Sequence, residues 1–189
     1  MRALGAVIAA LAIAGCGTAA RSNVRDARRT GQGVACSFAG EYKSLAQLRR
    51  DAASVAVIEP TGVVATRVVS GLPMKDATVD VIELVAGKRL PATFTLLGVA
   101  NPKLDGSQNC SPTIPTGNAY LVYLTPFRTR RNAPPAAGRF WVVGGPQGNY
   151  IHTGTPPPSD PQERSFVHQM SDVGRSLPQR ISIADARRS

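Results

Sequence analysis

The sequence predicts a small, mainly β domain of five or six short strands with short flanking helices, carried behind a signal peptide and a flexible tether. Two observations predict the strands. Short runs rich in Val, Ile and Thr recur between residues 54 and 151 with a period of two. Glycine and proline separate these runs, as is typical of a small barrel or sandwich. A third observation, an apolar run before a cysteine, predicts the signal peptide.

Residues 1–15 have the pattern of a signal peptide. Arg2 precedes an apolar run that ends at Gly15, which is shorter than the roughly 20 residues a membrane-spanning helix needs. The run closes with Ile13-Ala14-Gly15-Cys16, which matches the bacterial lipobox. We therefore expect cleavage before Cys16 and acylation of Cys16, which would hold the protein on the extracytoplasmic face of the cell membrane. A signal peptide with a coincidental cysteine is the alternative.

Residues 16–33 are small, polar and basic, and they predict a flexible lipidated tether. The whole chain carries a formal net charge of +10. Because an exported protein meets little nucleic acid, we expect this charge to face anionic lipid head groups and cell-wall polymers instead. No cofactor is expected.

Two further cysteines, Cys36 and Cys110, remain once Cys16 is lipidated. An even pair in an oxidising compartment favours a disulfide, and two buried free thiols are the alternative. A zinc site is not expected, because these cysteines are far apart and His152 and His168 are the only histidines in the chain.

The elements of the predicted barrel domain, residues 34–155, follow from local patterns. Ser44 as N-cap and Gln47 three residues later predict a helix over residues 45–53. Pro60-Thr61-Gly62 predicts a turn between two strands, and the alternation slips at Ile82 as if at a β-bulge. The predicted strands cover residues 54–59, 63–69, 77–85, 92–97 and 119–124, and a sixth begins at 140–143 and continues through a glycine-rich turn to 151.

Residues 156–189 are predicted to form a helical extension. Asp160 as N-cap, Pro161 and Glu163 open a helix whose apolar stripe would be Phe166, Met170 and Val173. A last short helix is expected over residues 182–188.

The runs SVAVIEPTG, TVDVIELVAGK, TGNAYLVYLTP and FWVVGGPQGNY together carry a resemblance. Over residues 44–152 the chain resembles a group of actinobacterial lipoproteins and secreted proteins without an assigned function. More remotely it is similar to the netrin-like module of tissue inhibitors of metalloproteinases. The resemblance implies an OB-like barrel and an actinobacterial cell membrane. The inhibitors chelate zinc through a free N-terminal cysteine, and we do not expect this here because the amine of Cys16 would be acylated.

No catalytic set is visible in the sequence. A Gly-x-Ser-x-Gly elbow is absent, and the four glutamates show no spacing typical of a glycosidase. His152 is expected after the sixth strand and His168 on the C-terminal helix, each as a surface or packing residue. Asp76 and Asp80 are expected to be solvated.

One group of residues suggests a binding surface, because arginines bind anions and aromatic faces stack on sugars or bases. It consists of Arg128, Arg130, Arg131, Arg139, Trp141 and Tyr150. The alternative is that the aromatic side chains belong to the core and the arginines only solubilise a loop.

The function predicted from these features is that of a membrane-anchored envelope module that binds a protein or an anionic glycan without catalysis. The alternatives are an envelope hydrolase whose residues meet only in the folded chain, and a protease inhibitor acting through a loop.

Overall fold

The computed structural model of the chain describes residues 41–69, 72–100, 114–129, 132–152, 164–169 and 176–189. The predicted signal peptide, tether, Cys16, Cys36 and Cys110 lie outside these residues, as do Arg130 and Arg131. Across the described residues, no helix is both long and apolar enough to cross a membrane.

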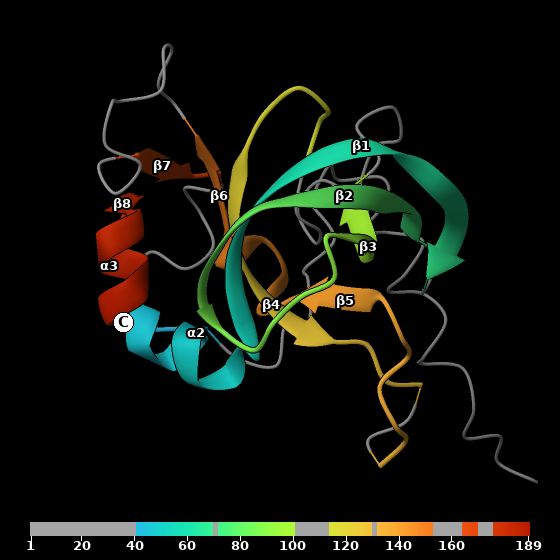
Figure 1. Cartoon of the computed structure of the whole chain (residues 1–189), viewed down its shortest axis with the longest axis horizontal. Helices are drawn as coiled ribbons and strands as arrows, with labels where there is room; N and C mark the ends of the chain where they lie inside the picture. Colours follow the sequence, from blue (N-terminus) through green and yellow to red (C-terminus); the bar gives the residue numbers. More distant parts are fainter. Residues whose placement is uncertain (1–40, 70–71, 101–113, 130–131, 153–163, 170–175) are drawn as a thin grey trace, which may run out of the picture. The chain divides into compact units, whose positions relative to one another are not determined.

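Five strands close into a barrel (Figure 1). They pair in the order β1-β2-β3-β5-β4, and β4 returns to pair with β1. All neighbours are antiparallel except β3 and β5, which are parallel. The predicted fold class, a small OB-like barrel with flanking short helices, is confirmed. The strands are β1 Ser54–Val69, β2 Leu72–Gly87, β3 Thr93–Ala100, β4 Tyr120–Pro126 and β5 Arg139–Val142.

The turn predicted at Pro60-Thr61-Gly62 is wrong, because β1 runs through it without a break. Pro60 lies opposite Val79, and the pairing with β2 shifts register between Pro60 and Gly62. A bulge lets a strand accommodate a proline, which cannot donate a ladder hydrogen bond. The bulge predicted at Ile82 is confirmed, since Val81 and Glu83 pair with successive residues of β1 and Ile82 is the extra one.

The interior of the barrel is filled by alternate side chains of all five strands. Ile58, Val79, Leu96, Val122 and Val142 are buried there. Strand β4 is buried on both faces, as its uninterrupted apolar run predicts, because Val122 and Leu124 point into the barrel and Leu121 and Tyr123 are covered by apolar side chains outside it.

Beyond the barrel, a 3-10 turn η1 (Gly145–Gly148) leads to β6 (Asn149–His152), and β6 is followed by β7 (Ser165–His168) and β8 (Arg180–Ser182). The helix predicted with an apolar stripe from Phe166 is wrong over the described residues, because 165–168 form a strand between β6 and β8. Phe166 and His168 are both buried, and this alternation with a period of two is that of a strand and not of a helix. The last short helix is confirmed as α3 (Ile183–Arg188).

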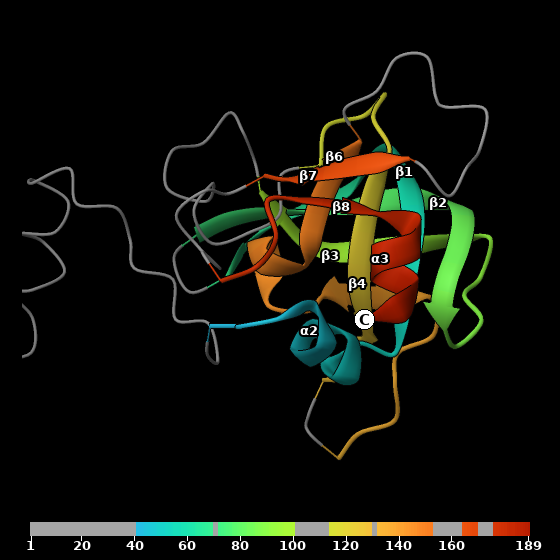
Figure 2. The ribbon, with the colours of Figure 1, turned by 90° about the vertical axis from the view of Figure 1, so that its left-hand side faces the viewer.

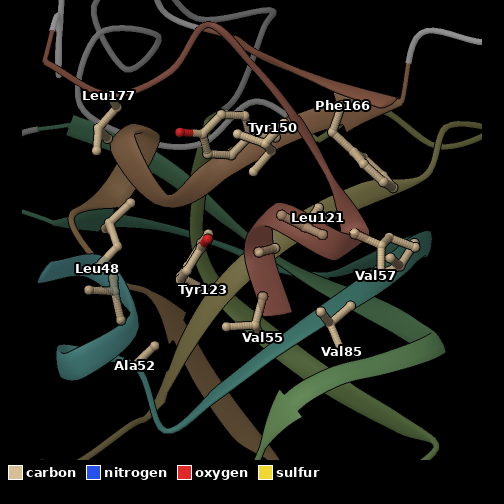
Figure 3. Packing of buried hydrophobic residues seen from close by; sticks show 14 residues of the cluster. Leu48, Ala52, Val55, Val57, Val85, Leu121, Tyr123, Tyr150, Phe166 and Leu177 are labelled. Carbon is tan, nitrogen blue, oxygen red and sulfur yellow. The ribbon is translucent and has the colours of Figure 1, made fainter. Parts of the chain in front are cut away.

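A second apolar cluster covers the outer side of β1 and β4 (Figure 3). Val55, Val57 and Leu121 point away from the barrel interior into this cluster, and Phe166 and Ile183 meet them from β7 and α3. Because α2 and α3 lie beside one another against this face (Figures 1 and 2), the C-terminal extension is part of the folded domain.

The predicted first helix is confirmed as α2 (Leu45–Asp51), with the Ser44 hydroxyl accepting from the Gln47 backbone N–H. Ahead of it, Tyr42 is held at three points. Its backbone N–H donates to Gln147 Oε1 at 2.8 Å, and its hydroxyl donates to Asp51 Oδ2 at 2.9 Å. Its ring lies so close to Gly144 that a Cβ there would approach it to 2.8 Å. Burial is the main reason that the pKa of Tyr42 rises to about 12.

We expect Ser182→Ala to destabilise the domain by about 1 kcal/mol, because Ser182 and Asp185 form a capping box at the start of α3. The hydrogen bonds from Ser182 hold the pKa of Asp185 below its usual value. A lowered carboxyl pKa gives stability that is present above the unfolded pKa and is lost as the pH falls through the folded one. Urea unfolding at pH 7 and in steps below pH 4 should therefore show a smaller acid-induced loss in Ser182→Ala than in the wild type. An equal loss would contradict this role.

Candidate functional site

The outer surface of β3 and β5 carries the best candidate for a binding site. Phe94 and Leu96 of β3 and Phe140 of β5 point into the barrel or its rim, so the residues between them face outward. Four outward residues define what we call the β3–β5 face: Thr93, Thr95, Arg139 and Trp141. Arg139 and Thr93 are exposed, whereas Thr95 and Trp141 are partly buried.

The strand register brings these side chains together. Thr95 lies directly opposite Arg139 in the parallel β3–β5 pair. Thr93 lies opposite Asp80 of β2, and its hydroxyl donates to Asp80 Oδ1 at 2.7 Å. The face therefore combines a guanidinium, two hydroxyls and an indole, and one carboxylate at its border orients Thr93.

Two aromatic contacts stiffen the face. Phe94 and Phe140 meet edge to face beneath it, with ring centroids 4.8 Å apart. The Trp141 ring lies against Phe127, which follows β4, at 5.5 Å and 58°. A side chain that is already packed on one side loses less conformational freedom when a ligand covers the other. Arg128 follows Phe127 and is exposed, and its guanidinium donates to the Ala133 carbonyl.

The predicted binding residues are thus only partly brought together. Arg139 and Trp141 share one face, and Arg128 is on the neighbouring loop. Tyr150 belongs elsewhere, because it is fully buried in the cluster outside β4, and its place in the predicted surface is wrong. Tyr150 is only nine residues from Trp141 in sequence, but η1 lies between β5 and β6. The Tyr150 side chain therefore points into the apolar cluster outside β4 and not onto the β3–β5 face.

Neither histidine lies on the β3–β5 face. His168 is buried in β7, where its ring packs on Tyr150 at 4.9 Å and its Nε2 lies 3.2 Å from the Gln147 carbonyl. His152 packs edge to face on Phe166 at 5.6 Å. Burial, and then the charge of Arg164, lower the pKa of His152. Both side chains therefore take part in packing between β6 and β7.

The acidic residues have structural contacts. Asp76 was expected to be solvated, but it is buried and its Oδ1 accepts the Gly98 N–H at 3.2 Å. Glu83 forms ion pairs with Arg164 at 3.1 Å and with Arg187 at 3.3 Å, which join β2 to the C-terminal extension. Within the described part of the chain, no three His, Cys, Asp or Glu side chains converge as metal ligands.

A shallow cavity of about 420 Å³ opens between α2 and the β8–α3 segment. Its apolar lining comprises Leu45, Ala46, Pro178 and Ile181. Its two arginines already have partners, because Arg188 pairs with Asp185 at 2.8 Å and Arg180 donates to Ser165 Oγ at 3.0 Å. This cavity has less to offer a ligand than the β3–β5 face.

The fold assigns the domain to the class of small OB-like barrels. No protein-family model matches the chain, and no curated protein matches it.

Proposed function

We propose that the chain is a lipid-anchored lipoprotein of a bacterial envelope, whose barrel binds an anionic glycan on the β3–β5 face without catalysis. One observation carries the proposal. An exposed arginine and a partly exposed tryptophan lie on the same side of β5, beside two threonine hydroxyls of β3.

This set of groups matches an acidic sugar. The indole offers a face on which a sugar ring can stack. The guanidinium presents a planar fork of donors that fits a carboxylate or a phosphate in two places at once. The hydroxyl of Thr95 can donate to and accept from sugar hydroxyls, and that of Thr93, which donates to Asp80, can accept from them. Barrels of this class bind oligosaccharides and oligonucleotides on the face of their second and third strands and on flanking loops, and β3 contributes to both surfaces.

The anchor rests on the lipobox at Cys16. We further propose that Cys36 and Cys110 form a disulfide, as an exported protein would allow. Mass spectrometry of the protein purified from bacterial membranes should find diacylglycerol on an N-terminal Cys16. It should also find a peptide pair joined through Cys36 and Cys110 that separates on reduction.

Trp141 provides a direct test of glycan binding, since it is the only tryptophan in the chain. We expect its fluorescence to change in a saturable way when acidic cell-wall glycan fragments are added to the mature protein. Arg139→Ala should weaken the binding at least about tenfold, because a hydrogen-bonded charged contact contributes roughly 1.5–3 kcal/mol. Arg180→Ala, which removes an exposed arginine from β8, is the matched control and should bind as the wild type does.

Equal weakening by Arg139→Ala and Arg180→Ala would contradict a defined site, because it would mean that only the net charge attracts the glycan. No response to any glycan, together with an envelope protein that is retained by the wild type and lost from Arg139→Ala, would make the ligand a protein instead.

A further inference from the structure

Most of the excess positive charge of the described residues is gathered at one end of the barrel. This basic end consists of the segment around α2, the β2–β3 loop and the beginning of the β4–β5 loop. Its cations are Lys43, Arg49, Arg50, Lys88, Arg89 and Arg128. Only two acids accompany them, Glu41 and Asp51, and Asp51 accepts the hydrogen bond of Tyr42.

The remaining described residues carry a smaller excess of positive charge. Seven cations lie outside the basic end: Arg67, Lys75, Arg139, Arg164, Arg180, Arg187 and Arg188. Five acids accompany them: Glu59, Asp76, Asp80, Glu83 and Asp185. Several of these charges form ion pairs with one another, as Glu83 does with Arg164 and Arg187. The basic end therefore has six cations against two acids, whereas the much longer remainder has seven cations against five acids.

Backbone hydrogen bonds hold the three segments of the basic end together. The N–H of Ala53, which follows α2, donates to the Leu124 carbonyl at the end of β4. The N–H of Lys88 donates to the Ala53 carbonyl at 2.9 Å, and the Ser54 hydroxyl donates to the Lys88 carbonyl at 2.7 Å. Both views show α2 and the loop after β4 on the same lower side of the domain (Figures 1 and 2).

The chain also enters the domain beside this end. Tyr42 is fixed by its hydrogen bonds to Gln147 and Asp51 and by the contact of its ring with Gly144. Residues 17–41 separate this fixed point from Cys16. Even fully extended, 25 residues span at most about 80–90 Å. The proposed anchor would thus keep the domain within reach of the bilayer, where the local concentration of lipid head groups is high.

We infer that the basic end docks on an anionic lipid surface and that this contact fixes the orientation of the domain. The inference rests on the lipid anchor proposed above. Clustered lysines and arginines are attracted to the phosphates of anionic lipids, and the attraction falls off within a Debye length. Side chains of a strand project from the wall of a barrel and not from its end. The β3–β5 face therefore stands beside the membrane and stays open to a glycan while the basic end is docked.

The test uses the lipidated protein reconstituted into vesicles that carry a dansyl-labelled lipid. Energy transfer from Trp141 to dansyl measures how near the domain lies to the head groups. We expect more transfer in vesicles with 30% phosphatidylglycerol than in pure phosphatidylcholine, and we expect salt to remove the difference. Lys88→Glu/Arg89→Glu should lower the docking equilibrium at least about 30-fold, from the attraction lost per basic residue near an anionic surface. Arg50→Glu, on α2, should lower it in the same direction.

Lys75→Glu is the control for Arg50→Glu, because it changes the net charge by the same amount on β2, twelve residues before the Gly87 end of that strand. Equal effects of Arg50→Glu and Lys75→Glu, or equal transfer in anionic and neutral vesicles, would overturn the inference. Flotation of the protein with neutral vesicles tests the proposed lipid anchor separately from the proposed docking of the basic end. Protein that fails to float lacks the anchor, whereas protein that floats without lipid-dependent transfer has the anchor and no docked orientation. Glycan binding by Arg50→Glu in detergent should remain as in the wild type.

Discussion

Phe166→Ala should lower the free energy of unfolding by roughly 3–5 kcal/mol, which is the usual cost of removing a buried aromatic side chain. Phe166 is fully buried, and its ring lies among the side chains that join the C-terminal extension to β1 and β4 (Figure 3). Truncation removes the ring that packs on His152 and leaves a cavity between β7 and the barrel wall. Urea unfolding followed by circular dichroism measures the loss.

Val167→Ala is the control for this prediction. Val167 neighbours Phe166 on β7 but points the other way and is only partly buried, so we expect its truncation to cost less than about 1.5 kcal/mol. Similar losses from the two substitutions would contradict the strand assignment of residues 165–168. They would also remove the argument that the extension belongs to the folded domain.

Gly87→Ala should destabilise the domain by roughly 2–6 kcal/mol, for two separate reasons. Gly87 has φ +92°, a backbone conformation that costs a residue with a side chain about 1–3 kcal/mol. A Cβ at this position would also lie 2.3 Å from the Ala53 carbonyl oxygen and 2.9 Å from Ser54 Cα. Overpacking of this kind costs about another 1–3 kcal/mol. Because Ala53 and Ser54 hold the β2–β3 loop, thermal unfolding should reveal a large fall in melting temperature.

Gly117→Ala separates the two causes. Gly117 has φ +80°, but a Cβ there would meet no atom within 4 Å, so only the backbone cost of about 1–3 kcal/mol applies. A loss in Gly87→Ala no larger than that in Gly117→Ala would contradict the close approach of β2 to the start of β1.

Much of the barrel could be predicted because its signals are local. Ser44 and Gln47 predict α2, and the slip of alternation at Ile82 predicts a bulge that the register confirms. The unbroken apolar run of β4 predicts a strand buried on both faces. Each of these patterns depends on neighbouring residues alone.

The wrong predictions arose where tertiary contacts override local preference. Pro60 and Gly62 favour a turn, but β2 pairs on both sides of them and a register shift absorbs the irregularity. Asp160-Pro161 is a good start for a helix, but Phe166 and His168 are buried between β6 and β8 with a period of two. The strand pairing of a short segment is decided by its partners, which the local pattern does not contain.

Only part of the candidate site could be predicted, because tertiary contacts bring the other part together. Arg139 and Trp141 are close in sequence and stood out as a basic and aromatic pair. Thr93 and Thr95 were not predicted, because only the parallel pairing of β3 with β5 brings them beside Arg139. The basic end could not be predicted either, because hydrogen bonds between the β2–β3 loop and the residues after α2 place Lys88 and Arg89 beside that helix. Spacing along the chain carries no signal for such contacts.

The measurement that tests the central claim most directly is nuclear magnetic resonance of the labelled mature protein titrated with acidic cell-wall glycan fragments. Binding to the β3–β5 face predicts that the largest shift changes come from the amides of Thr93, Thr95 and Arg139 and from the indole N–H of Trp141. Changes confined to the cavity between α2 and α3, or no saturable change at any resonance, would contradict the account.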